Sequence, residues 1–283
     1  MVTTNIWKSA STAFSRSAFT DVIKYKDFSQ FDWVRSICLQ GESVSTYGEL
    51  LDVVYTNMVK HYRCEYVYKN EIIRQLLRNF RKSDTAVVFN EFRVGDSIAD
   101  LAIFNGESKA FEIKTEFDSP KRLDKQINDY SRVFEKCYVV IPEKKMYEYG
   151  HCLDNNTGIL TLDYKKGHLS IDTFREAERN DSIDVAVLIR CLRTKEYEKI
   201  VSSYYGKLPD VHSAYMFDAC QEQMSAMPIA ILRESFITAM KQRRNGLSHL
   251  IKVPQTLMQL CTALNLRDKE ITSLIELLNT NIA

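Results

Sequence analysis

The chain has 283 residues, 45% of them hydrophobic and 27% charged, with a formal net charge of +1. This length allows one large or two small domains. The balanced charge excludes a strong global field that would attract nucleic acid or membrane, so any nucleic-acid site is expected to be local. There is no C-x-x-C pair, no glycine-rich phosphate loop and no long apolar run. We therefore expect a soluble protein of the reducing cytoplasm without structural zinc, ATPase motor or membrane span.

The first 62 residues are predicted to be a helical extension. Residues 1–18 are rich in Ser and Thr and poor in apolar residues, which predicts a flexible or loosely docked start. From Phe19 to Tyr62 apolar residues recur at helical spacing, with Ser45 or Thr46 as an expected N-cap.

A short amphipathic helix and a strand are predicted next. In residues 68–82 the apolar residues fall on one helical face, and Asn70 is the expected N-cap. Residues 85–94 are predicted to form the first strand, in which Glu91 and Arg93 alternate with apolar Phe92 and Val94.

The following stretch predicts a β-hairpin that carries opposed acidic groups. Strand-forming residues on both sides of Asn105 and Gly106 predict two antiparallel strands joined by a tight turn. A loop of residues 105–107 pairs residue 104 with residue 108 and places Asp100 opposite Glu112 on one face, which Lys114 shares. Facing carboxylates repel each other, and this arrangement suits a divalent cation better than plain structure.

A helix, a buried strand and a further hairpin are predicted to complete a central domain. Residues 121–135 have a buried stripe at helical spacing, with Gln126 one turn before Tyr130. The apolar run 137–141 predicts a strand parallel to its predecessor, followed by a helix over 143–153 and strands over 158–162 and 168–174. The predicted fold class is therefore α/β with a mixed central sheet.

Asp100, the run Glu112-Ile113-Lys114 and the pair Gln126 and Tyr130 together resemble the PD-(D/E)XK nuclease superfamily. The branch most similar is that of the RecB-type nucleases, whose helix carries a Q-x-x-x-Y element. The resemblance covers about residues 68 to 175, and the predicted element order αβββαβ matches the restriction-endonuclease-like core. Ala99 stands where the family has proline, so only the acidic half of the first motif is present.

The resemblance implies a Mg²⁺-dependent deoxyribonuclease, with Mn²⁺ as a substitute. Asp100, Glu112 and the Ile113 carbonyl are expected to hold the metal, Lys114 to serve the attacking water, and Gln126 and Tyr130 to orient phosphate or catalytic groups. The family's preceding helix often adds an acid to the metal site, and Glu71 is the candidate here. An ordinary ion pair with Arg74 is the alternative.

Two further sets of charged residues have both a functional and an ordinary interpretation. Glu91 supports the metal site or is a solvated strand charge. Basic residues at two helices are candidates for phosphate contacts or solvated faces. They are Lys121, Arg122, Lys125, Arg74 and Arg78.

From residue 183 onward helices are predicted over 185–201, 214–224, 228–244, 254–264 and 267–278. The last two invite a helix-turn-helix interpretation, although two amphipathic helices with a polar turn are commonplace. Lys241, Arg243 and Arg244 form another basic cluster that could touch a phosphate backbone. The predicted organisation is a helical extension (1–62), a nuclease core (63–178) and a C-terminal helical region (179–283).

The predicted partner is DNA, single-stranded or duplex, in a defence, mobile-element or repair context, with a partner protein on the helical flanks and no membrane. One alternative is a catalytically silent nucleic-acid-binding or scaffold module on the same fold. The other is a non-nuclease α/β domain in which Glu112 and Lys114 form a surface salt bridge, which leaves Asp100 without a role.

Overall fold

A mixed six-stranded sheet forms the centre of the protein in the computed structural model, which describes residues 2–39, 44–79, 86–165 and 167–282. The strands lie in chain order, with antiparallel pairs β1/β2, β2/β3 and β5/β6 and parallel pairs β3/β4 and β4/β5. Their bounds are β1 Val87–Val94, β2 Ser97–Phe104, β3 Ser108–Ile113, β4 Lys136–Pro142, β5 Gly158–Lys165 and β6 His168–Arg175. The α/β class and the order helix, three strands, helix, strand are confirmed.

The N-terminal region packs as helices from its first described residues. The helices are α1 Val2–Ala10, α2 Arg16–Tyr25, α3 Ser29–Cys38 and α4 Tyr47–His61. The expectation of a loosely docked start is wrong, because Trp7 and Phe14 are buried in the core. The two apolar side chains lie one helical repeat of seven residues apart, a signal that the Ser/Thr content obscures. Thr46 caps α4 by accepting the Glu49 amide at 3.2 Å, as predicted.

Helix α5, Glu65–Asn79, begins one turn earlier than the sequence pattern indicates. Asn70 is therefore no N-cap but an interior residue, and it is fully buried. Its side chain donates to Tyr55 Oη at 2.9 Å and accepts from the Gln259 amide at 2.9 Å. The predicted end of this helix at Lys82 and the strand start at Thr85 lie outside the described residues.

The β2–β3 hairpin has the predicted register, because Phe104 pairs with Ser108 across a turn in which Gly106 has φ 105°. Toward the turn, alternate residues of β2 enter opposite cores: Ile103 packs on one face and Phe104 on the other. This alternation breaks near Asp100, because Leu101 enters the core that holds Ile103, although Ala99 enters the core that holds Phe104. Asp100 therefore lies where β2 changes the face that it presents.

Glu91 of β1 lies level with this change. It occupies the register position next to Asp100, between the pairs Asn90↔Leu101 and Phe92↔Ala99, and has φ 59°. A left-handed conformation is uncommon for a residue other than glycine and marks an irregular point in the strand. Both strands are therefore distorted at the level of Asp100.

The remaining helices cover the sheet and extend beyond it. Their bounds are α6 Leu123–Ser131, α7 Met146–Cys152, α8 Val185–Cys191, α9 Thr194–Tyr205, α10 Met216–Ser225, α11 Ile229–Arg243, α12 Met258–Ala263 and α13 Asp268–Leu278. The single helix predicted over 185–201 is two helices, because Leu192 adopts an extended conformation between them. The helix predicted from residue 254 begins as a 3-10 turn, Gln255–Leu257.

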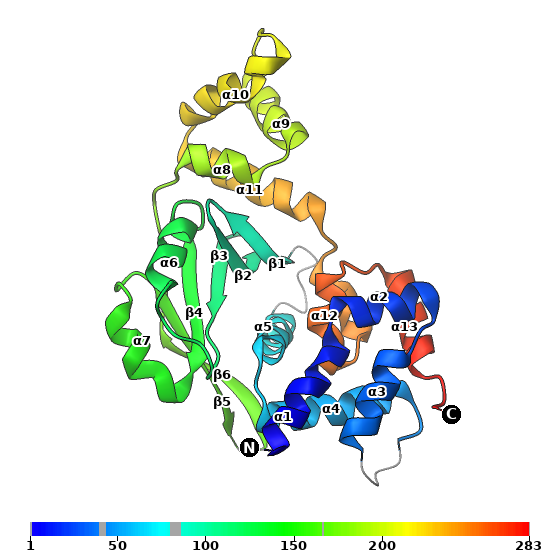
Figure 1. The fold of residues 1–283 in the computed structure, drawn as a ribbon. Helices are drawn as coiled ribbons and strands as arrows, with labels where there is room; N and C mark the ends of the chain where they lie inside the picture. The colour runs from blue at the N-terminus through cyan, green and yellow to red at the C-terminus, as the bar shows by residue number, and fades with distance from the viewer. Residues whose placement is uncertain (1, 40–43, 80–85, 166, 283) are drawn as a thin grey trace.

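Helices cover both faces of the sheet (Figure 1), and an apolar core lies on each face. One joins the sheet to α1–α5, α12 and α13, and the other joins it to α6 and α8–α11. The N-terminal and C-terminal segments therefore share cores with the central strands. Among the described helices, none has the length and apolar character needed to cross a bilayer.

Candidate active site

The open end of the β2–β3 hairpin brings the predicted acidic residues together. The strand ladder ends at the pair Leu101↔Phe111, and the next two residues outward are Asp100 and Glu112. Asp100 Oδ2 accepts the Ile113 amide at 2.7 Å, so the carboxylate takes the place of a backbone acceptor between the strands. This contact fixes Asp100 against the C-terminal end of β3.

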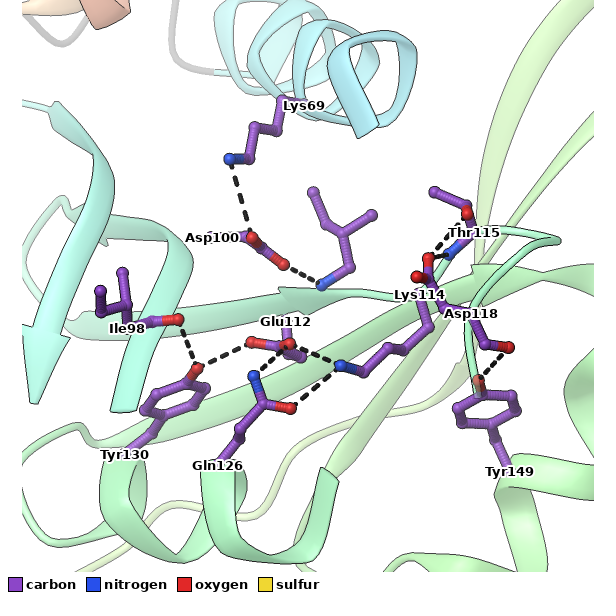
Figure 2. A network of polar contacts seen from close by, with 11 residues as sticks. Lys69, Ile98, Asp100, Glu112, Lys114, Thr115, Asp118, Gln126, Tyr130 and Tyr149 are labelled. Atoms are coloured by element: carbon purple, nitrogen blue, oxygen red, sulfur yellow. Dashed lines mark hydrogen bonds and ion pairs between the residues drawn. The ribbon is translucent and has the colours of Figure 1, made fainter. Parts of the chain in front are cut away.

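Asp100 and Glu112 reach this point from different sides, which corrects the expectation of one shared face. Figure 2 shows Asp100 directed toward α5 and Glu112 toward α6. The cause is the face change of β2 at Asp100 described above. The two carboxylates still interact, because the negative charge of Glu112 is among the causes that raise the pKa of Asp100.

Glu112 is the centre of a buried polar network (Figure 2). The residue is 3% exposed, and its Oε1 accepts from Lys114 Nζ at 2.8 Å and from Gln126 Nε2 at 2.6 Å. Gln126 Oε1 also accepts from Lys114 Nζ, at 3.0 Å. The lysine, glutamate and glutamine therefore hold one another in a fixed arrangement.

Tyr130, one helical turn after Gln126, completes this network from α6. Its hydroxyl lies 2.7 Å from Glu112 Oε2 and 2.8 Å from the carbonyl oxygen of Ile98. A hydroxyl carries one proton, so it donates to one of these oxygens at a time. Burial, followed by the charge of Glu112, raises the pKa of Tyr130, and the phenol stays protonated. The structure thus brings both predicted residues of α6 into contact with Glu112 of β3.

Asp100 faces a buried ammonium on its other side. Lys69 of α5 is 3% exposed, and its Nζ lies 3.7 Å from Asp100 Oδ1 and pairs with Glu65 one helical turn earlier. Burial raises the pKa of Asp100 to about 7, the nearby charges of Glu112 and then Glu65 add to this, and Lys69 opposes it. Burial and these two carboxylates therefore favour the neutral form of Asp100 more strongly than Lys69 favours the charged form.

The backbone carbonyl of Ile113 points into the space between the ends of β2 and β3. The Lys114 amide donates to the Val140 carbonyl on β4 at 2.9 Å. In an extended chain the carbonyl of one residue points opposite to the amide of the next, so the Ile113 carbonyl points toward β2 and Asp100. This backbone oxygen therefore lies on the side required for the predicted role.

Glu71 does not join this group. It lies two residues after Lys69, about 200° around the helix, and so faces away from Asp100. The Glu71 side chain is buried and pairs with Arg74 at 2.8 Å, and burial raises its pKa. The predicted metal-site role is replaced by the ion pair that the sequence offered as the alternative. The acid of α5 that does lie near Asp100 is Glu65.

The side chain of Glu91 also points away from the Glu112 network. It is exposed and forms an ion pair with Arg16 at 3.4 Å. Its left-handed backbone conformation turns the side chain out of the sheet, so it does not support the acidic pair. The ordinary interpretation, a solvated strand charge, describes its position.

The predicted phosphate-binding residues divide into two groups. Lys121, Arg122 and Lys125 are exposed at the start of α6, within two turns of Gln126, and Lys125 lies 3.7 Å from Asp96. Arg74, bound to Glu71, and exposed Arg78 share the other side of α5 and lie away from Asp100. Only the α6 group is beside the site.

Sequence reasoning missed Glu65 and Lys69 because it began the helix too late. The signal was present, since Glu65 and Lys69 have the i,i+4 spacing of a helical ion pair. Extending the helix by one turn would have placed both residues on the side opposite Glu71.

Comparison with known proteins places the chain in a family. The family model of Bacteriophage P4 protein cII matches residues 58–266. The chain belongs to this family. Protein cII of Enterobacteria phage P4 is 28% identical over 184 residues, which cover 64% of this chain and 68% of that protein. The matched range of the cII family contains the whole site from Glu65 to Tyr130.

One solved structure resembles part of the chain. It is the SPO1766 protein of unknown function from Silicibacter pomeroyi, with 16% identity and a TM-score of 0.32. The similarity covers 48% of this chain and 87% of that one. A TM-score this low does not show a common fold or a common site.

Proposed function

We propose that this cII-family protein is a metal-dependent nuclease that hydrolyses phosphodiester bonds of DNA. The observation that carries the proposal is the Glu112 network, in which Lys114, Gln126 and Tyr130 all contact one buried carboxylate beside Asp100. A buried structural carboxylate also takes three donors, as Glu135 does from Ser108 and Arg179, so the second carboxylate, Asp100, beside the network is what favours metal chemistry. The resemblance to PD-(D/E)XK nucleases supports the same reading.

The donor set fits a hard divalent cation such as Mg²⁺ or Mn²⁺. Among the described residues, the Lys69 ammonium at 3.7 Å is the one partner of Asp100 Oδ1, and the Ile113 carbonyl points toward Asp100. Mg²⁺ keeps several waters and needs one or two carboxylates from protein. No group of three or more His, Cys, Asp or Glu side chains converges as a metal site in the described part of the chain, which this small donor requirement accommodates.

A bound divalent cation would lower the pKa of a coordinated water and neutralise charge on the phosphate oxygens. The chain's own groups have separate tasks. Lys114 lies where it can hold the attacking water and offset the negative charge that develops on the scissile phosphate. Gln126 fixes the Lys114 ammonium, and Tyr130 fixes Glu112. Asp100 would hold the cation from the neighbouring strand.

The test is a cleavage assay with end-labelled single-stranded DNA, blunt duplex, nicked circle and RNA in Mg²⁺ or Mn²⁺. We expect cleavage of DNA by the wild type and none in EDTA. Asp100→Asn and Glu112→Gln should lower the rate by at least about 10²-fold, because the first removes a charged ligand and the second removes the carboxylate that holds Lys114. Glu222→Gln, which changes an exposed carboxylate of α10, should match the wild type. Equal cleavage by all four proteins would reject the proposal.

A catalytically silent nucleic-acid-binding or scaffold module is the second candidate. It is favoured by the two lysines, since Lys69 and Lys114 already neutralise Asp100 and Glu112 without a metal. On this account the protein acts with a partner protein bound to its helical flanks. DNA binding that persists in EDTA, with no cleavage in any metal by the wild type, would select this candidate.

A further inference from the structure

Five arginines gather around one depression at the edge strand β1, apart from the Glu112 network. The depression has a volume of about 420 Å³ and lies between β1, the junction of α8 and α9, and the end of α11. Its charged lining is Arg93, Arg190, Arg193, Arg243, Arg244 and Glu91.

Most of this positive charge is not neutralised. Arg243 is held by Glu196, with Nε 2.6 Å from Oε1, and Glu91 by Arg16. Within the described chain, the remaining four arginines of the lining have no carboxylate at ion-pair distance. A concave surface with an excess of unpaired guanidinium groups attracts anions.

The charges also crowd one another. The Arg244 guanidinium lies 4.9 Å from the centre of the Phe89 ring and is partly buried. Burial lowers its pKa, and the neighbouring charges of Arg16 and Arg193 lower it further. Folding thus holds like charges together at a cost, which an anionic ligand would relieve.

The chemistry of the lining favours phosphate. Guanidinium groups match the oxygens of phosphate with two parallel hydrogen bonds. The aromatic side chains of the lining, Phe89 and Phe92, are buried and offer no surface on which a base could stack. Recognition would therefore be of the backbone, independent of base sequence and sensitive to salt.

The depression includes a residue of β1 that lies level with Asp100 of the proposed active site. Glu91 in its lining and Asp100 occupy neighbouring register positions on β1 and β2, and adjacent strands lie about 4.8 Å apart. One strand of nucleic acid could contact both places. We propose that the arginine depression binds the phosphates of a nucleic-acid strand whose scissile bond lies at Asp100 and Glu112. This inference rests on the proposed function for the position of the scissile bond.

The test measures binding without cleavage. Fluorescence anisotropy of a labelled single-stranded oligonucleotide is followed in EDTA over a range of salt concentrations, with the full-length wild type and Arg93→Gln/Arg193→Gln. Both arginines are exposed, so thermal melting should be unchanged. We expect about tenfold weaker binding. The slope of log affinity against log salt should fall by about 1.4, since each phosphate contact contributes about 0.7.

Two controls separate position from net charge. Lys8→Gln/Lys207→Gln removes two exposed cations elsewhere and should keep the wild-type affinity. Arg93→Lys/Arg193→Lys should keep most of the salt slope. Equal affinities for the Gln double variant and the Lys8/Lys207 control would overturn the inference. Pyrophosphate that binds the wild type but not the Gln variant, while oligonucleotide affinity is unchanged, would assign the depression to a small anion and also overturn it.

The two proposals fail separately. Weaker binding of Arg93→Gln/Arg193→Gln together with no cleavage by the wild type in Mg²⁺ or Mn²⁺ would support the arginine depression and reject the nuclease. Cleavage by the wild type with unchanged binding of that variant would do the reverse.

Discussion

Opposing influences act on the charge state of Asp100 in the folded protein. Burial and the nearby carboxylates of Glu112 and Glu65 favour its neutral form, and Lys69 and the Ile113 amide favour the charged form. In the folded protein its pKa is raised to about 7 from an ordinary value of 3.8. Such a carboxyl exchanges its proton for a metal ion in the neutral pH range.

This balance predicts a pH-dependent stability difference for Asp100→Asn in EDTA. The folded protein holds the Asp100 proton more tightly than the unfolded chain does, so its contribution is favourable at low pH and is lost as the pH rises through about 7. Asparagine mimics the protonated form and should raise the free energy of unfolding by roughly 1–3 kcal/mol at pH 8. The gain should shrink steadily toward pH 4. Urea unfolding at several pH values measures it, and a gain independent of pH would contradict the shift.

Tyr130 gives a second prediction at this scale. Tyr130→Phe removes the donor 2.7 Å from Glu112 Oε2 and leaves a buried carboxylate oxygen without it. The expected loss of stability is about 1–3 kcal/mol in urea unfolding. Tyr147→Phe, at a residue 75% exposed, is the matched control and should change stability by less than about 0.5 kcal/mol. Equal stabilities for the two variants would show that the hydroxyl does not support Glu112.

Helix α5 supplies the ammonium partner of Asp100, and the β2–β3 hairpin positions Glu112 for its contacts with α6. The hairpin register could be predicted because a three-residue turn around Gly106 allows only one pairing of the two strands. The face change at Asp100 could not, because no residue type signals the irregular point that Asp100 shares with the left-handed Glu91 of the neighbouring strand. The sequence pattern did not show the true start of α5, because Glu65 and Lys69 are charged and add nothing to the apolar periodicity from which the helix was predicted. Their partner Asp100 is 31 residues beyond Lys69 in the chain.

Helix α5 provides a test through Lys69. Lys69→Met keeps the length of the side chain and removes the ammonium between Glu65 and Asp100. We expect a lower melting temperature in EDTA, because two carboxylates lose their counter-charge. Mg²⁺ should then raise the melting temperature more than it does in the wild type, since the cation no longer competes with the lysine.

The control for this variant is Lys60→Met, at an exposed position near the end of α4. It should melt as the wild type does with and without Mg²⁺. A Mg²⁺-induced shift that is the same in Lys69→Met and the wild type would show that the lysine and the metal do not share Asp100.

At the scale of the whole molecule, the sheet and the helical flanks form shared cores. The core on the α5 face contains residues of α1 and α13, and the core on the α6 face contains residues of α8–α11. Individual helices of the flanks could be predicted from apolar spacing, but their packing against the sheet could not, because it depends on contacts between distant segments. The family match over residues 58–266 likewise runs through the sheet and into these helices.

This sharing predicts that a fragment of residues 63–178 does not fold on its own. Removal of both flanks would expose the apolar residues of the sheet on both faces, among them Ile103 and Phe104, which are fully buried in the intact chain. Calorimetry should show a cooperative transition for the full chain and none for the fragment. A sharp transition of the fragment near the melting temperature of the full chain would contradict the shared cores.

We propose that Lys114 acts on a phosphodiester and does not merely pair with Glu112. The most direct measurement is the single-turnover rate of DNA cleavage in Mg²⁺ by the wild type, Lys114→Ala and Lys109→Ala. The control residue lies on β3, the strand that Lys114 directly follows, and pairs with Glu107 at 3.1 Å, away from the site. We expect a rate at least about 10²-fold lower for Lys114→Ala, with its fold retained, and an unchanged rate for Lys109→Ala. Cleavage by Lys114→Ala at the wild-type rate, or no cleavage by the wild type in any metal, would contradict it.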